Sequence, residues 1–475
     1  MREVEIDAIP LARLAALLAP ERVEKLNRYT VLAQQLLRGR VVWSVNATAR
    51  GGGVAEMLQA LLAYARGAEV DARWLVLSAD NEFFAITKRV HNLLHGAPGD
   101  GGPLGEAERA HYREVAERNV EMMRSVVKAG DIVLLHDPQP AGMVEGLRDA
   151  GAHVVWRSHV GRDTPNEYTE QAWDFLREFI EPADAFIFSR AEYAPSWIPT
   201  EMVRLIPPSL DPFSAKNATL DPADVATTLR VAGLVDTPPN GGSLQFTRRD
   251  GTQGEVRRHA GLLREGGVVP GSAQVVLQVS RWDRLKDMQG VLTGFARQLD
   301  QMPETAHLML VGPDVSGVAD DPEGAEVFEE CMAAWRALPA PARNRVHLCS
   351  LPMDDVDENA HLVNALQRHA AVVVQKSLVE GFGLTVTEPM WKARPVIASA
   401  VGGIRDQIED GVSGILLTDP NDLDTFGKHV REVLYDEELG RRLGTAAQAR
   451  VQDRFLGDRH LIQYVELFQT LLERG

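Results

Sequence analysis

Two glutamates bracket a glycine turn in the segment Gln375 to Trp391, QKSLVEGFGLTVTEPMW. The segment follows an apolar run typical of a short buried strand, and it passes through Glu380-Gly381-Phe382-Gly383 into an expected helix that opens at Leu384. Glycines allow a ligand to approach the backbone, and the first amides of a helix have no internal partner, so the turn suits a phosphate. Glu380 and Glu388 suit hydroxyl groups, because one carboxylate can accept from two of them. Together these features predict a site for a sugar nucleotide.

A second group of charged residues fits the same chemistry. Arg281 and Lys286 follow an expected strand at Gln274–Val279. A departing nucleoside diphosphate gains negative charge, which either a metal held by carboxylates or fixed cations and helix amides must stabilise. The sequence has no compact His/Asp/Glu cluster, so we predict no metal site and assign this role to the two basic residues. The simpler explanations remain open: glycine turns are common in α/β domains, and Arg281, Lys286 and Glu388 could be solvated surface residues.

The N-terminal half contains another glycine turn, in N-A-T-A-R-G-G-G-V-A-E-M-L at 46–58, directly after an expected strand at 40–45. It matches neither the dinucleotide fingerprint nor a P-loop, and a tight turn for helix packing is the alternative. Polar residues follow this strand and three later ones, namely Asn46, Asp80, Asp137 and His159. Ligands bind at the carboxyl ends of parallel strands, so these residues are candidates. His159 could also be a packed histidine, and His136 and His91 are weaker candidates.

The organisation of the chain follows from its length and patterning. A length of 475 residues favours two domains, and strands alternating with helices predict an α/β fold with doubly wound parallel sheets. Prolines in IPPSLDPF, 206–213, indicate a linker. We therefore expect a first domain at 1–208 with a helical extension at 8–38, a second at 209–455, and a final helical segment at 456–475. The turn-rich stretch Thr237–Gly254 is expected to be a surface loop.

Composition excludes several classes of protein. The net charge of −17 argues against a general nucleic-acid binder. Two cysteines without metal-like spacing favour buried thiols in a reducing compartment. No signal peptide or membrane-length apolar run is apparent, so we expect a cytoplasmic protein without a membrane partner. Apolar residues in the N-terminal helices favour a homodimer.

Four of these segments resemble a known family. E-G-F-G-L-x-x-x-E at 380–388 and R-x-x-x-x-K at 281–286 resemble the donor-site signature of retaining GT-B glycosyltransferases of family 4. W-R-S-H at 156–159 and the glycine run at 46–58 are similar to the trehalose-forming members, the glycosyltransferring trehalose synthases. The resemblance implies a GT-B fold, with two Rossmann-like domains facing a cleft and a last helix that crosses back to the first domain.

The resemblance also implies residue roles. Glu380 is expected to face the transferred sugar, Glu388 to bind the ribose, and the amides near Gly383 to meet the diphosphate. The catalytic set is His159, Arg281, Lys286 and Glu380. The set implied for the donor is Gly52, Gly53, Arg281, Lys286, Leu351, Met353, Glu380, Gly381, Phe382, Gly383, Leu384, Thr385 and Glu388. The set implied for the acceptor is Asn46, Glu56, Asp80, Lys88, Asp137, Arg157 and His159.

The reaction implied is transfer of glucose from an NDP-glucose to glucose, forming trehalose with retention, without a tightly bound cofactor and with Mg²⁺ as a stimulator at most. The sequence does not choose between UDP-, ADP- and GDP-glucose. A retaining trehalose phosphorylase and a catalytically silent sugar-nucleotide sensor are the alternatives. A retaining glycosidase would need two flanking carboxyls, and the sequence offers no acidic pair near His159. One departure from the family is Pro389, which we expect to be tolerated in the first turn of its helix.

Overall fold

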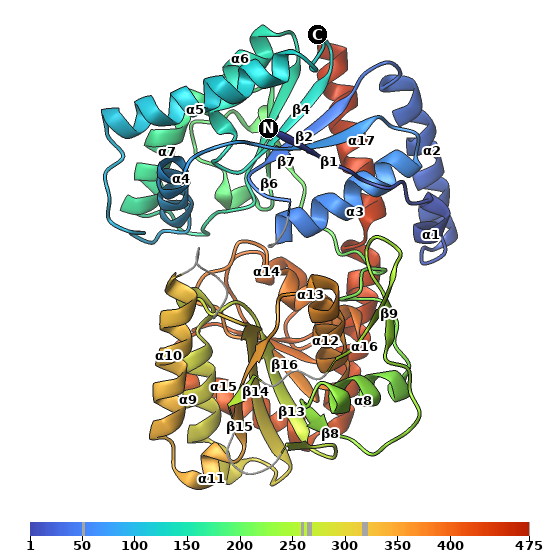
Figure 1. The fold of residues 1–475 in the computed structure, drawn as a ribbon, viewed down its shortest axis with the longest axis vertical. Helices are drawn as coiled ribbons and strands as arrows, with labels where there is room; N and C mark the ends of the chain where they lie inside the picture. The colour runs from blue at the N-terminus through green and yellow to red at the C-terminus, as the bar shows by residue number, and fades with distance from the viewer. Residues whose placement is uncertain (50–52, 258–260, 264–267, 316–321, 475) are drawn as a thin grey trace. The chain divides into compact units, whose positions relative to one another are not determined.

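A computed structural model of the protein describes residues 1–49, 53–257, 261–263, 268–315 and 322–474. The chain forms two compact units (Figure 1): unit 1 contains Met1–Leu210 and Phe455–Gly475, and unit 2 contains Asp211–Arg454. In each unit a seven-stranded sheet lies between helices. Among the described helices, none has the length and apolar character needed to cross a membrane.

The sheet of unit 1 is doubly wound. In spatial order its strands are β1 (Arg2–Val4), β3 (Ala72–Val76), β2 (Val42–Asn46), β4 (Ile132–His136), β5 (His153–Arg157), β6 (Ala185–Phe188) and β7 (Val203–Leu205). Neighbours are parallel, except that β1 is an antiparallel edge strand beside β3. The chain runs from β2 to β3 on one side and later adds β4 on the other, so the strand order reverses between β2 and β4. Such a switch point leaves a crevice at the carboxyl ends of the strands.

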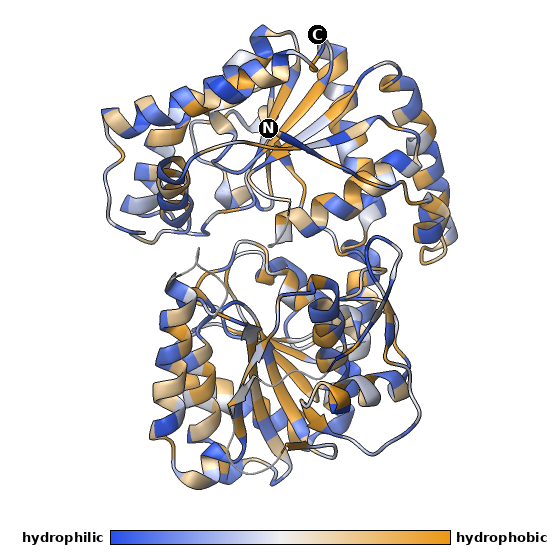
Figure 2. Ribbon diagram, viewed as in Figure 1, coloured by the Kyte–Doolittle hydropathy of each residue, from blue (hydrophilic) through white to orange (hydrophobic). Residues whose placement is uncertain are grey.

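Helices cover both faces of this sheet. They are α1 (Leu11–Ala15), α2 (Pro20–Leu36), α3 (Gly53–Gly67), α4 (Asn81–Leu94), α5 (Glu106–Arg124), α6 (Val144–Asp149), α7 (Glu167–Ile180) and α17 (Gly457–Arg474). Trp43 and Val45 of β2 pack with α4 to α7, whereas Val42 packs with α2, α3 and α17. Because both faces are covered, the strands are nearly continuous apolar runs, as the hydropathy colouring of Figure 2 shows.

The N-terminal helices pack inside unit 1. Leu14, Leu26 and Ala33 are buried, and Arg22 on α2 forms an ion pair with Asp458 on α17, with 2.7 Å between Nη2 and Oδ1. Their apolar faces therefore have partners within the chain. The apolarity from which a homodimer was predicted has this intrachain explanation, and the homodimer stays a prediction.

The sheet of unit 2 repeats the winding. In spatial order its strands are β11 (Leu262–Leu263), β15 (Val346–Leu351), β14 (Ala306–Pro313), β13 (Gln274–Val279), β16 (Val372–Gln375), β17 (Val396–Ser399) and β18 (Ile415–Leu417). All neighbours are parallel except β11, which runs antiparallel to β15. Here the order reverses between β13 and β16, which makes this pair of strand ends the switch point.

The helices of unit 2 also form two layers. They are α8 (Pro222–Val231), α9 (Met288–Arg297), α10 (Pro322–Ala337), α11 (Ala340–Arg343), α12 (Val356–His369), α13 (Leu384–Trp391), α14 (Ile404–Gln407), α15 (Leu423–Tyr435) and α16 (Glu437–Arg454). Residues of α9, α10 and α15 share one core cluster, and residues of α8 and α12 share another. Small strands β8 (Val235–Asp236) and β12 (Val269–Pro270) pair beside α8.

The prediction of a simple surface loop at Thr237–Gly254 was wrong. β9 (Gln245–Thr247) pairs with β10 (Gln253–Glu255) as an antiparallel hairpin. Phe246 at its centre is buried and stacks on His361 of α12, with ring centroids 5.0 Å apart. The polar turn residues of this segment made its short strands unrecognisable from the sequence, and one buried aromatic side chain holds the hairpin in place.

Candidate functional site

The switch point of unit 2 brings Lys286 and Glu380 together. Lys286 ends the 3₁₀ turn Arg284–Lys286 after β13, and Glu380 follows β16. The two segments are joined where Leu378 N–H donates to Leu285 O at 2.8 Å. Lys286 Nζ then lies 2.6 Å from Glu380 Oε2, and the side chains are only 15% and 10% exposed. A cation and a carboxylate are thus held at the carboxyl edge of the sheet.

Neighbouring polar groups hold this pair in position. Ser377 Oγ donates to the same Glu380 Oε2 at 3.1 Å. Gln278, buried at the end of β13, donates to the backbone carbonyl of Lys286 at 2.8 Å. Lys376 is buried and bonds to Asp287, the residue that caps α9. The carboxylate of Glu380 and the backbone of Lys286 are therefore each held from the end of the preceding strand.

The predicted glycine turn leads into α13 as expected. Gly383 has φ +86° and precedes the helix, and a Cβ at this position would lie 3.0 Å from Glu380 Cγ, so the turn requires glycine. Gly381 and Phe382 are buried, whereas Gly383, Leu384 and Thr385 are partly exposed. Because glycine has no side chain to cap a helix, the opening amides of α13 are available to an anion.

Glu388 lies deeper than Glu380. It is buried on α13, where Gln367 Nε2 donates to its Oε2 at 3.3 Å and Lys216 Nζ lies 3.5 Å from its Oε1. The expectation for Pro389 was wrong. It is the sixth residue of α13, in the second turn, and it has no N–H for the carbonyl of Thr385 four residues earlier. The helix ends at Trp391, so only a short segment carries this defect.

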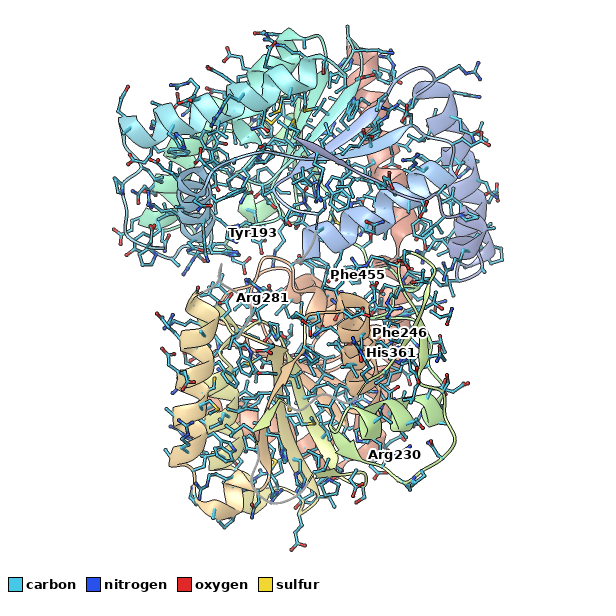
Figure 3. The ribbon with its side chains drawn as sticks, in the orientation of Figure 1. Tyr193, Arg230, Phe246, Arg281, His361 and Phe455 are labelled. Atoms are coloured by element: carbon cyan, nitrogen blue, oxygen red, sulfur yellow. The ribbon has the colours of Figure 1, made fainter. Side chains whose placement is uncertain are left out.

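The remaining predicted donor residues are dispersed. Arg281 has a 63% exposed side chain that bonds Asp283 at 3.2 Å, and it lies at the top of unit 2 in the view of Figure 3. It does not join the Lys286–Glu380 pair. Leu351, at the end of β15, is buried, and Met353 just beyond it is exposed. β15 is two strands from β13, so these two residues lie further along the same edge of the sheet.

In unit 1 the structure pairs two histidines. His136 ends β4, and His159 lies two residues beyond β5. The Nδ1 of His136 is 3.0 Å from the Nε2 of His159, and the rings are stacked with centroids 5.3 Å apart. Asp137, in the left-handed region with φ +68°, accepts from the backbone N–H of His159 at 2.8 Å. His136 and Asp137 thus lie at the end of β4, the strand at the switch point, and His159 follows the neighbouring strand β5.

Burial sets the protonation of this cluster. It lowers the pKa of His136 to about 3 and that of His159 well below its usual value, and the charge of Arg157 adds to both effects. Burial also raises the pKa of Asp137 to about 7. At neutral pH both imidazoles are therefore neutral.

The expectation that Arg157 binds an acceptor is corrected. Its side chain is fully buried, and its guanidinium bonds His460 Nε2 at 2.9 Å, Tyr464 Oη at 2.5 Å and the Ile206 carbonyl at 2.9 Å. A buried guanidinium needs such partners, because an unpaired charge in the interior is very costly. Arg157 anchors α17 within unit 1 and cannot contact a substrate.

Of the other acceptor candidates, Asn46 ends β2 directly beside β4, whereas Asp80 follows β3, one strand further away. Asn46 is buried. Its Nδ2 donates to the Thr48 carbonyl at 2.7 Å, and its Oδ1 accepts from Trp74 Nε1 at 2.8 Å. Asp80 caps α4, and its Oδ1 lies 2.9 Å from His111 Nε2. It follows β3, which is separated from β4 by β2. Glu56 and Lys88 are exposed on helices α3 and α4. Gly53, which was predicted for the donor together with Gly52, is exposed at the start of α3. Gly52 lies outside the described residues.

Sequence reasoning missed several residues of these clusters. His136 was ranked low, although its place beside Asp137 at a strand end was a usable signal. Ser377 is three residues before Glu380 and could have been suspected from that spacing. Lys216 lies in the segment after the linker, far from Glu388 in the chain, and nothing in the sequence connects them.

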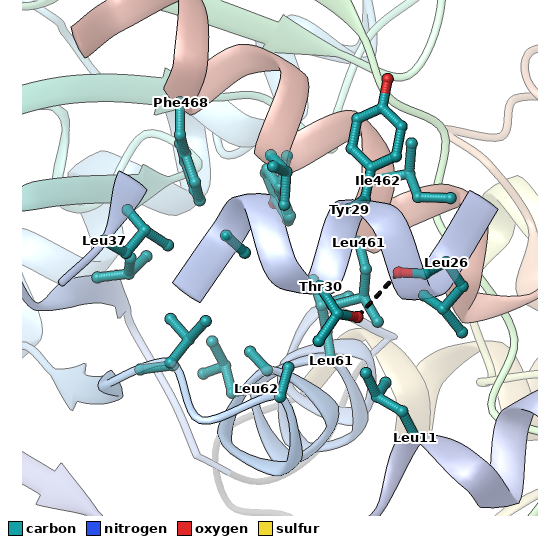
Figure 4. A pocket seen from close by; sticks show the side chains of 18 of the residues that line it. Leu11, Leu26, Tyr29, Thr30, Leu37, Leu61, Leu62, Leu461, Ile462 and Phe468 are labelled. Atoms are coloured by element: carbon teal, nitrogen blue, oxygen red, sulfur yellow. Dashed lines mark hydrogen bonds between the residues drawn. The ribbon is translucent and has the colours of Figure 1, made fainter. Parts of the chain in front are cut away.

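An apolar cavity of about 60 Å³ in unit 1 is distinct from these clusters. It lies among α2, α3, α17 and the sheet (Figure 4). The hydroxyl of Thr30, one of its few polar groups, donates to the carbonyl of Leu26. Its lining is almost entirely apolar, whereas sugars and phosphates need polar partners. The cavity therefore does not fit a sugar nucleotide.

Two family models match successive parts of the chain. The family described as "Trehalose synthase, N-terminal domain" matches residues 44–195, and "Glycosyl transferases group 1" matches residues 263–450. The chain is 32% identical to trehalose synthase of Pyrococcus horikoshii over 459 residues, covering 96% of this chain and 95% of that protein. It is 27% identical to trehalose phosphorylase of Pleurotus pulmonarius over 453 residues, covering 90% of this chain and 57% of that protein.

The fold has matches among solved structures. Anabaena HepE, solved with UDP and glucose, superposes with a TM-score of 0.61 at 18% identity, covering 91% of this chain and all of that one. This confirms the predicted GT-B architecture of two Rossmann-like domains. With the near-complete match to trehalose synthases, the conclusion is that this chain belongs to the trehalose synthase family of GT-B glycosyltransferases.

Proposed function

We propose that the protein transfers a glucosyl group from a nucleoside diphosphate glucose to glucose, reversibly and with retention of configuration, to form trehalose. One observation carries the proposal: Lys286 and Glu380 are joined at 2.6 Å beside the uncapped start of α13. A cation, a hydroxyl acceptor and free helix amides are the three groups that a sugar diphosphate requires. Trehalose is the product named for the relatives that match nearly the whole chain.

Unit 2 supplies the donor site in this proposal. The diphosphate binds the amides of Leu384 and Thr385 and the ammonium of Lys286, which stabilise the charge that grows as the glycosidic bond to phosphate breaks. Glu380 exchanges its bond with Lys286 for the hydroxyls of the transferred glucose. Glu388 binds the ribose, and Lys216, 3.5 Å from its Oε1, is its cationic neighbour.

Unit 1 supplies the acceptor site. His159 is neutral and has one ring nitrogen outside the histidine pair, so it can orient a sugar hydroxyl. Asp137 holds the backbone of His159 and lies at the same strand edge. In this scheme the leaving phosphate takes the proton of the acceptor hydroxyl, and the protein supplies orientation and electrostatic stabilisation. A glycosidase mechanism would instead require a second carboxyl about 5 Å from Asp137.

Two other functions remain testable. A retaining trehalose phosphorylase is favoured by a specific observation, because fungal proteins of that name match 90% of this chain at 27% identity. It would place inorganic phosphate where the diphosphate binds. A silent sugar-nucleotide sensor would keep the donor site and lack turnover.

A substrate panel distinguishes these functions. Purified protein is incubated with UDP-, ADP- or GDP-glucose and glucose, and the products are identified by NMR, which reports the configuration at both anomeric carbons. We expect α,α-trehalose and free NDP. Cleavage of trehalose by phosphate without nucleotide would identify a phosphorylase, and NDP-glucose binding without turnover would identify a sensor.

A further inference from the structure

His136 is fully buried, and the mechanism above gives it no role. Its Nδ1 faces the Nε2 of His159 at 3.0 Å. Its other ring nitrogen, Nε2, is buried and has no hydrogen-bond partner in the part of the chain that the structure describes. A buried imidazole that uses one nitrogen on a candidate substrate-binding histidine can control the state of that histidine.

A single proton lies between the two facing ring nitrogens. Burial and the nearby charge of Arg157 keep both rings neutral, so each carries one N–H. Between Nδ1 of His136 and Nε2 of His159, one nitrogen must donate and the other accept. Two arrangements satisfy this requirement, and they leave His159 with opposite properties toward a substrate.

The unpartnered nitrogen decides between them. If His159 donated, the proton of His136 would have to sit on its Nε2, as a buried N–H without an acceptor. Such groups are rare and cost about 1–3 kcal/mol. If His136 donates, its Nε2 carries only a lone pair, which the positive field of Arg157 favours over an N–H dipole. The second arrangement is therefore the more stable.

We propose that His136 is a positioning residue that donates from Nδ1 to His159 and holds His159 as the Nδ1–H tautomer. His159 then presents an N–H donor outside the pair and no free lone pair. It can bind a substrate oxygen that accepts a hydrogen bond, but it cannot abstract a proton. That this oxygen belongs to a sugar rests on the proposed function, whereas the tautomer itself does not.

The direct test is the tautomer of His159 in the ligand-free protein. The intact chain is labelled with ¹⁵N-histidine, and the ring nitrogens are observed by long-range ¹H–¹⁵N correlation, with His159→Gln used for assignment. We expect Nδ1 of His159 to be the protonated nitrogen. Protonation at Nε2 of His159 would overturn the proposal. This measurement needs no turnover, so an inactive protein or an unexpected substrate would leave it valid.

Variants separate positioning from packing. His136→Leu should release His159 from the Nδ1–H tautomer and lower kcat for glucosyl transfer by roughly ten-fold, the scale typical of residues that orient a functional histidine. His136→Asn retains an N–H near the position of Nδ1 and should retain the tautomer and most of the activity. The control is His307→Leu, because His307 and His347 form a pair with the same 3.0 Å contact in unit 2.

The outcomes of this series are decisive in both directions. Loss of the tautomer and of activity in His136→Leu, with recovery in His136→Asn and no change in His307→Leu, would support the proposal. Reduced activity with the His159 tautomer unchanged would show a purely structural role and overturn it. If His136→Leu does not fold, the wild-type spectrum alone decides.

Discussion

Replacing Lys286 by methionine should impair turnover far more than it impairs acceptor binding. Methionine keeps the length and apolar stem of the side chain and removes the charge, so the variant isolates the ammonium. In the free protein that ammonium is tied to Glu380 at 2.6 Å, and in the proposed reaction it turns to the departing diphosphate. The interaction is largest in the transition state, where the charge on the leaving group has grown.

The magnitude follows from the geometry. Two unit charges about 4 Å apart interact by about 4 kcal/mol at an effective dielectric of roughly 20. The side chain of Lys286 is 15% exposed, so solvent screens it little. The bond to Glu380 must be exchanged first, which offsets part of the gain, and about 3 kcal/mol remains, as for other donors to a developing charge. That corresponds to a loss in kcat of about one hundred-fold.

The assay compares kcat and KM for NDP-glucose and for glucose in wild type, Lys286→Met and Arg284→Met. Arg284 lies in the same 3₁₀ turn, is half exposed and pairs with Glu326 and Glu330, so it is a matched loss of one charge. We expect Arg284→Met to stay within about two-fold of wild type, because exposed ion pairs contribute little. Thermal unfolding of each variant confirms that folded protein is measured. The reasoning is refuted if Lys286→Met keeps near wild-type turnover, or if both variants lose activity equally.

Three further predictions follow from the same structure. His159→Ala should lower transfer to glucose strongly while calorimetry finds NDP affinity nearly unchanged, because the proposed nucleotide site belongs to unit 2; collapse of NDP affinity with transfer intact would count against the placement of His159. Excess chelator should leave most activity, because side chains and helix amides meet the leaving-group charge; complete loss that Mg²⁺ restores would refute this. The free energy of unfolding should fall as the pH is lowered from about 6.5 to about 3, because His136 has a folded pKa of about 3 against 6.5 when unfolded and unfolding takes up a proton in that window. His136→Gln should reduce this slope by up to about 1.4 kcal/mol per pH unit, measured by urea unfolding at several pH values, and an unchanged slope would contradict the buried neutral state.

Local patterns in the sequence were enough to predict the α/β class and many of the elements. Apolar runs placed β13 and β16, because a strand covered on both faces must be apolar throughout. The glycine turn before α13 was also predictable, since the backbone at Gly383 is left-handed and a side chain there would crowd Glu380. Likewise Pro222 opens α8 after Asp221, as the preference of proline for a first helical position indicates. These features depend on a few neighbouring residues.

The composition of the site was decided by tertiary structure. Lys286 meets Glu380 across 94 positions of sequence only because β16 is placed beside β13, and His136 meets His159 only because β4 lies beside β5. Arg157 was assigned to the acceptor by the resemblance of W-R-S-H, yet the packing of α17 encloses it. Phe246 lies in a segment that reads as a loop, and its stacking on His361 holds that segment as a hairpin. Residue type and spacing specify what a side chain can do. Which groups it reaches depends on the order of strands in the sheet and on which helices cover them, and those are set by burial of apolar surface across the whole unit.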